Sequence, residues 1–134
     1  MLEFAFVAPV LLMLLLGVIE IARFYFTHQS VKTLAAEGAR AALVFTASSA
    51  SGCTALSSNV TAVKNTALGK TPFLHSMSAA GNSFTITCTV NADGQYVIDV
   101  TITYAFQTLV PFLSFLSTNV TDSTRLTSQQ TRAA

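Results

Sequence analysis

Residues 4–19 read FAFVAPVLLMLLLGVI and contain no charged side chain. As a helix, this stretch is apolar on every side, which is typical of a segment that is buried on every side. The apolar segment 1–22 has close to the roughly 20 residues that cross a bilayer as a helix. The chain as a whole is 51% hydrophobic and 10% charged, and its charges are concentrated after this segment. The sequence therefore predicts a membrane or polymer interior around residues 4–19.

The helix is expected to continue to about residue 45, and its second half is amphipathic. From Phe24 onward, apolar and small residues fall within one arc of about a third of the circumference. These residues are Phe24, Val31, Leu34, Ala35, Gly38, Ala41, Ala42 and Phe45, and the opposite arc holds Gln29, Lys32, Thr33, Glu37 and Arg40. We predict a boundary near Arg23, with residues 1–23 in the membrane or a filament core. Residues 24–45 are expected to pack one face on a head that spans residues 24–134.

A loop and a short second helix are predicted over residues 46–70. Within this range, the helix is expected at 54–68, with Thr54 as its N-cap and Gly69 at its end.

Three strands are predicted between residues 84 and 130. Residues 84–90 and 96–106 alternate apolar and polar side chains around a turn at 91–94, and residues 120–130 form a weaker, Thr-rich strand. The expected fold class is α+β: a long N-terminal α-helix packed on a small antiparallel β-sheet head with a short second helix.

The charge and motif content argue against several function classes. The net charge is +1 and no run of basic residues occurs, so no nucleic-acid partner is expected. His28 and His75 have no acid or nucleophile nearby in sequence, and the cysteines form no CxxC pair. We expect no catalytic site, no cofactor and no metal site, and thus no enzyme.

Cys53 and Cys88 have two interpretations. In a cytosolic protein they would be two buried thiols, whereas a head outside the inner membrane favours a structural disulfide. Two further short motifs, at Asn59 and Asn119, match the glycosylation sequon Asn-X-Thr.

The apolar segment could be a secretory signal, an ordinary anchor or a processed subunit helix. A signal needs a basic region before the apolar run, and no Lys or Arg precedes Arg23. For an ordinary anchor, the basic residues Arg23, Lys32 and Arg40 would place the head in the cytoplasm. A basic leader before Met1 that was removed after setting the orientation would resolve this conflict.

The opening Glu3–Leu12 (EFAFVAPVLL), the leucine run, Gly17 and Glu20 resemble TadE-like pilins of tight-adherence systems, which are relatives of type IV pilins. Residues 104–117 resemble the C-terminal part of that family more loosely. The resemblance implies a leader removed by a prepilin peptidase in the inner membrane, and assembly machinery that packs the helices of identical copies into an extracellular filament used for attachment. In the family the glutamate usually stands fifth after the cleavage point, whereas here it is third from the start.

Glu3 and Pro9 are the two candidate functional residues in the apolar segment. A lone carboxylate costs several kcal/mol to bury without a partner. A helix N-terminus offers it only about 0.3–1 kcal/mol. The resemblance implies instead that Glu3 pairs with the terminal amine of a neighbouring subunit during assembly. Pro9 removes a helical hydrogen bond and is expected to kink the helix.

Two acid–base pairs follow on the same helix, Glu20 with Arg23 and Glu37 with Arg40. Each pair is three residues apart and is interpreted as lying on a solvated face or an interface.

Three functions remain in order of support. The first is a structural filament subunit, and the second is a membrane-anchored binding module or minor pilin with a ligand-recognising head. The third is an accessory membrane enzyme.

Overall fold

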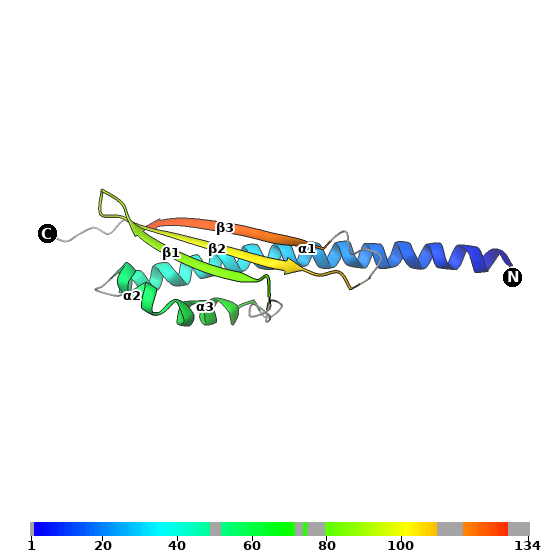
Figure 1. The fold of residues 1–134 in the computed structure, drawn as a ribbon, viewed down its shortest axis with the longest axis horizontal. Coiled ribbons are helices and arrows are strands. Elements are labelled where there is room, and N and C mark those ends of the chain that lie inside the picture. Colours follow the sequence, from blue (N-terminus) through cyan, green and yellow to red (C-terminus); the bar gives the residue numbers. More distant parts are fainter. Residues whose placement is uncertain (1, 49–51, 72–73, 75–79, 110–116, 129–134) are drawn as a thin grey trace.

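The long helix α1 (Leu2–Ser48) lies alongside the sheet, and its N-terminal part extends beyond the sheet (Figure 1). The structure is a computed structural model that describes residues 2–48, 52–71, 74, 80–109 and 117–128, with side chains from residue 6 onward. At about 1.5 Å per residue, α1 is about 70 Å long. The helix runs through Pro9 without interruption. The predicted kink there stays a prediction.

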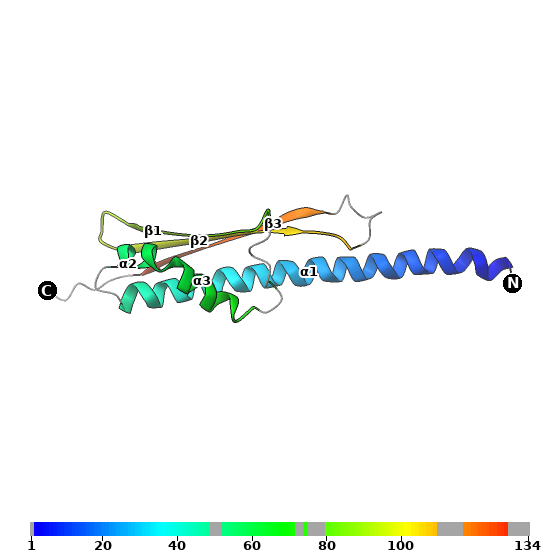
Figure 2. The same cartoon turned by 60° about the horizontal axis from the view of Figure 1, so that its bottom comes forward.

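A three-stranded antiparallel sheet lies along the second half of α1, in the order β1-β2-β3 (Figure 2). Its strands are β1 (Ser83–Val90), β2 (Tyr96–Phe106) and β3 (Thr118–Ser128). The predicted α+β fold class is confirmed. The third strand begins two residues before its predicted start, and residues 129–130 of the prediction lie outside the described residues.

The core lies between the sheet and the amphipathic half of α1. Five α1 residues have no exposed surface, namely Val31, Leu34, Ala35, Ala39 and Ala42. Facing them, β2 contributes Ile98, Val100, Ile102 and Phe106, all buried. These burials agree with the predicted apolar arc and with the inward face of β2, which follow from the helix and strand periods. Two residues differ from the prediction: Ala39, outside the predicted arc, is fully buried, and Val97, expected on the wet face of β2, is 3% exposed.

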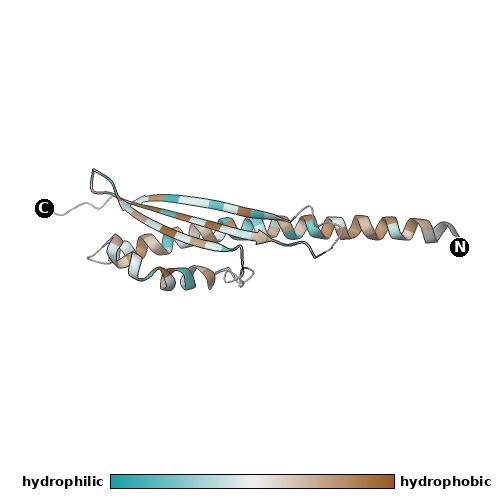
Figure 3. Cartoon of the chain, viewed as in Figure 1, coloured by the Kyte–Doolittle hydropathy of each residue, from teal (hydrophilic) through white to brown (hydrophobic). Residues whose placement is uncertain are grey.

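The outer face of the sheet carries mainly hydroxyl groups, with Val97 and Ala105 as apolar exceptions. In register, Thr85 lies opposite Thr101, which in turn lies opposite Ser123. The charged pair on this face, Asp99 and Arg125, is cross-strand, with 3.0 Å between Oδ1 and Nε. Figure 3 shows the contrast between this mixed surface and the continuously apolar N-terminal part of α1.

The predicted second helix is broken in two, which corrects the sequence prediction. The structure has α2 (Cys53–Ser58) and α3 (Val60–Leu68), separated at Asn59. Ser58 Oγ and Asn59 Nδ2 both donate to the carbonyl of Ala55, at 2.9 and 3.0 Å. Such side-chain bonds compete with helix continuation. The predicted N-cap, Thr54, lies inside α2, whereas α3 ends at Leu68, directly before Gly69.

Two glycines allow close approaches that shape the head. A Cβ at Gly38 of α1 would lie 2.9 Å from Phe84 Cζ and 3.4 Å from Val100 Cγ1, so this glycine sets how near the sheet lies to the helix. Gly52 has a φ of +50°, a conformation that favours glycine. A Cβ there would overlap the Tyr96 ring, 2.6 Å from Cζ.

Candidate functional site

The first candidate surface is the N-terminal part of α1, residues 6–19, which we call the apolar shaft. Its large side chains are 39–75% exposed, from Leu16 at the low end to Phe6 at the high end. They point in all directions around the helix axis because they occupy nearly every position, and no strand of the sheet lies beside them (Figures 1 and 2). The exposed large side chains of the shaft are Phe6, Val7, Val10, Leu11, Leu12, Met13, Leu14, Leu15, Leu16, Val18 and Ile19.

Within the described residues, α1 is the one helix long and apolar enough to cross a membrane. Its most apolar stretch has a mean hydropathy of 2.2 and is 6% buried. The core helix of a soluble protein would be mostly buried, so this low burial indicates a surface that is covered from outside the molecule. The shaft is therefore suited to anchoring in a membrane.

Glu3 lies in the first turns of α1, and its side chain is outside the described part of the structure. Its predicted pairing with a terminal amine therefore stays a prediction.

Glu20 marks the point where the shaft meets the head, and its environment differs from the one predicted. The predicted pair with Arg23 is present, and because the Glu20 side chain is only 5% exposed, the solvated-face alternative is wrong for Glu20 and the interface alternative remains. Arg23 Nη1 lies 3.1 Å from Oε2, and the backbone N–H of Leu109 donates to Oε1 at 2.8 Å. Leu109 follows the end of β2, so this carboxylate joins α1 to a residue 89 positions later in the chain.

Aromatic contacts also hold α1 against the end of β2 near Glu20. The rings of Phe24 and Phe106 meet edge to face, with centroids 5.3 Å apart at 83°. The Arg23 guanidinium lies 5.9 Å from the Phe106 centroid, within cation–π range. We refer to Glu20, Arg23, Phe24, Phe106 and Leu109 as the junction.

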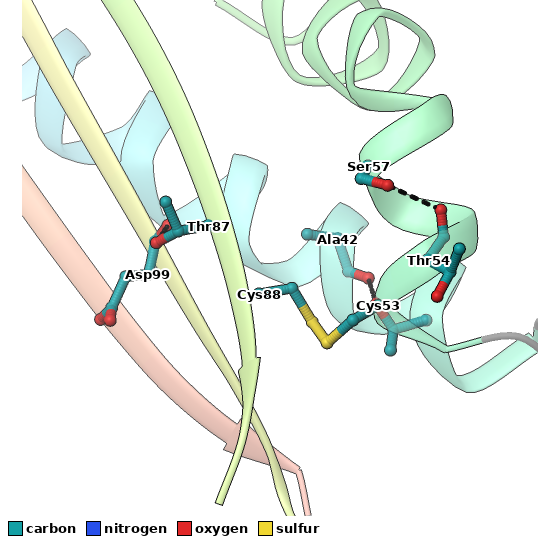
Figure 4. The surroundings of a disulfide bond; sticks show 8 residues. Ala42, Cys53, Thr54, Ser57, Thr87, Cys88 and Asp99 are labelled. Carbon is teal, nitrogen blue, oxygen red and sulfur yellow. Dashed lines mark hydrogen bonds between the residues drawn. A yellow bond between two sulfur atoms is a disulfide. The ribbon is translucent and has the colours of Figure 1, made fainter.

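A disulfide joins Cys53 at the start of α2 to Cys88 in β1 (Figure 4). It closes a sequence separation of 35 residues, with the two Cα atoms 5.4 Å apart. The bond therefore links the segment after α1 to the edge of the sheet. Of the two interpretations that the sequence left open, the structure has the disulfide.

Glu37 has a nearer partner than the one predicted from its spacing. Lys70, just after α3, donates to Oε2 at 2.8 Å, whereas Arg40 Nη1 is 3.9 Å from Oε1. The hydrogen bond from Lys70, with the positive charges of Lys70 and Arg40, lowers the pKa of Glu37 below its ordinary value of 4.5, although partial burial acts in the opposite direction. Sequence spacing could not find Lys70, which is 33 residues away.

A groove of about 700 Å³ opens between α1 and the residues that follow α3, with Arg23, Lys70 and Tyr104 among its lining. Both cations already have carboxylate partners, Glu20 and Glu37 respectively. The α1 hydroxyls in the lining also donate to helix carbonyls, as Thr27 Oγ1 does to Arg23 O at 2.9 Å. Among the described residues that line this groove, both cations are therefore already paired.

The remaining predicted site residues lie apart from the shaft and the junction. Asn59 is exposed at the break between α2 and α3, and its Nδ2 donates to Ala55 O, while Asn119 is exposed near the start of β3. Among the described residues, no group of three or more His, Cys, Asp and Glu side chains is arranged to hold a metal ion.

Comparison with known proteins gives one result that bears on this site. No curated protein and no solved structure matches the chain. Residues 1–40 match the family model described as TadE-like protein. The matched range contains the apolar shaft, Glu20, Arg23 and the first turns of α1 that pack on the sheet. Over these 40 residues the chain is similar to TadE-like proteins, and this similarity supports an association with the tight-adherence (Tad) pilus system.

Proposed function

We propose that the chain is a structural subunit that polymerises through α1 into an extracellular filament used in surface attachment. The observation that supports this proposal is the apolar shaft, whose large side chains are 39–75% exposed although the head has a closed core of its own. In a bilayer, lipid covers these side chains. In a filament, the shafts of neighbouring copies cover one another.

The shaft supplies most of the assembly energy in this proposal. Burying one large apolar side chain contributes roughly 1.5–3 kcal/mol relative to water, and the shaft presents such side chains on every side. The outer face of the sheet is hydroxyl-rich, and Val90 is the one exposed large apolar residue in the described strands. The chain catalyses no reaction in this role, and its partners are identical copies and the assembly machinery.

The head is the part that faces outside the cell. The Cys53–Cys88 disulfide suits an oxidising compartment. Before assembly, the shaft holds the subunit in the inner membrane, and the head lies on the outer side.

The first experiment removes the shaft. We place the cut after Ile19 because Glu20, Arg23 and Phe24 all contact the head. Deletion of residues 1–19 should give a soluble monomer by sedimentation velocity, whereas the full chain forms fibres or needs detergent. A truncated head that still polymerised would replace the shaft model with a head-to-head mechanism.

A matched pair of substitutions tests the same point in the full chain. Leu12→Glu and Val90→Glu each place a carboxylate on an exposed apolar position, at 59% and 57% exposure. Only the first lies on the shaft. We expect Leu12→Glu to abolish fibres in sheared cell-surface material and Val90→Glu to leave their yield unchanged; equal yields would contradict the proposal.

The second experiment tests the role of Glu3, which rests on the sequence. Glu3→Gln should leave the protein in the membrane but block its incorporation into fibres. Glu37→Gln is the control, because Glu37 has partners within its own head. Normal fibre yield from Glu3→Gln would remove the support for pairing with a terminal amine.

A further inference from the structure

Leu109 is the most exposed large apolar side chain in the described part of the structure, at 78%. It belongs to the head and not to α1, as does Val90 of β1, which is 57% exposed. The hydrogen bond from its N–H to Glu20 Oε1, 2.8 Å long, holds it beside α1 at the last turn of the shaft. An exposed apolar residue of the head is thus held by its backbone at the residue that directly follows the shaft.

If the shaft spans a bilayer, its length places Glu20 and Leu109 at the membrane edge. The uncharged stretch 4–19 is about 24 Å long as a helix, close to the roughly 30 Å of the hydrocarbon layer. Glu20 and Arg23 are the first charges after it. Tyr25 and Phe26, 64% and 74% exposed, follow at the position where aromatic residues border membranes.

Both ends of the sheet carry exposed polar residues, Asn119 opposite Ala105 at one end and the β1–β2 turn at the other. The end that carries Leu109 points toward the N-terminus of α1, and the β1–β2 turn lies at the opposite end (Figures 1 and 2). That turn contains Asn91 and Asp93, both exposed. Residues 107–109 carry no charge. Glu20, the acid beside Leu109, is buried and already paired with Arg23.

We propose that Leu109 is a second membrane contact: the end of β2 rests on the lipid surface, at the boundary between headgroups and acyl chains. Glu20 sets this contact by holding the Leu109 backbone against α1. The head of the unassembled subunit is then fixed at two points, the shaft and Leu109. The inference rests on the membrane-anchored state in the proposed function.

The test uses the absence of tryptophan from this chain. Three full-length variants each carry one probe: Leu109→Trp, Val90→Trp at the far end of the sheet, and Leu12→Trp in the shaft. Each is placed as a single copy in phosphatidylcholine nanodiscs with lipids that carry a quencher just below the headgroup or deep in the chains. Circular dichroism checks that each variant keeps the native spectrum.

We expect the Leu109→Trp emission to be blue-shifted and quenched by the shallow label, and Val90→Trp to stay unshifted and unquenched. Adding Glu20→Ala to the Leu109→Trp variant should reduce the quenching, because residue 109 loses its hydrogen bond to α1. If Leu12→Trp is quenched and Leu109→Trp is not, the contact does not exist, although anchoring stands.

Two other outcomes also overturn the inference. If Leu12→Trp itself is unquenched, the anchoring in the proposed function fails together with the contact. If the Leu109→Trp probe is shielded only in lipid-free fibres, a second copy of the chain covers this residue and the membrane does not.

Discussion

Glu20→Ala should destabilise the head measurably, although the residue lies at its very edge. The substitution removes a charged acceptor for the Leu109 N–H, and a hydrogen bond to a charged group contributes roughly 1.5–3 kcal/mol. This hydrogen bond is only partly buried, so the lower half of that range applies. The pair with Arg23, whose side chain is 42% exposed, adds less than about 1 kcal/mol. We expect a loss of about 2 kcal/mol, and about half as much for Glu20→Gln, which keeps an acceptor oxygen.

Thermal unfolding in a mild non-ionic detergent measures this loss, with near-UV circular dichroism of the tyrosines as the signal. For a folded unit of this size, each kcal/mol shifts Tm by roughly 3–6 °C. Glu37→Ala is the matched control. Glu37 also precedes an arginine by three residues, but its partners Lys70 and Arg40 are 58% and 76% exposed. A Tm loss for Glu20→Ala no larger than that of the control would refute the junction as a stabilising contact.

Three further predictions concern the head. Gly38→Leu should cost roughly 1–3 kcal/mol by overpacking against the sheet, whereas Gly17→Leu, with nothing within 4 Å of its added Cβ, should leave the unfolding midpoint unchanged. Replacing Cys53 and Cys88 by serine should lower the unfolding free energy by about 4 kcal/mol in the loop-entropy model. If the native chain has the same thermal unfolding midpoint before and after reduction, the disulfide does not stabilise the fold. Because the folded-state pKa of Glu37 is lowered, the ionised Glu37 contributes to stability above pH 4.5, and this contribution is lost as pH falls through the folded pKa. The unfolding free energy of Glu37→Gln should therefore decrease less steeply than that of the native chain as pH falls below 4.5.

The parts of the fold that could be predicted are those with a strong local period. The apolar arc of α1 repeats with the helix period, and the side chains of β2 alternate with the strand period. In each case the local residue pattern alone predicts which face of the element is buried. The end of α3 before Gly69 is equally local. The break at Asn59 was missed because the apolar spacing continues across it. Its cause, hydrogen bonds from Ser58 and Asn59 to Ala55 O, competes with that spacing without altering it.

The junction could not be predicted, and the two acid–base pairs of α1 show why. Glu20 with Arg23 and Glu37 with Arg40 have the same spacing, so helix geometry gives them the same interpretation. The structure separates them through partners that are far away in sequence: Leu109 for Glu20 and Lys70 for Glu37. The alternation that predicts β2 ends at Phe106, before the residue whose N–H reaches the helix.

This difference has a functional consequence for the helix. The acid nearest the shaft is taken out of solvent and used to hold the head, whereas the acid farther along stays partly exposed. A carboxylate left unpaired at the edge of a membrane or of a filament core would oppose burial of the adjacent apolar turns. Because Glu20 is already paired with Arg23 and the Leu109 amide within the subunit, the desolvation cost of an unpaired carboxylate does not arise when the shaft is covered. In the proposed function, lipid or a neighbouring copy can then cover the last turn of the shaft without burying an unpaired carboxylate.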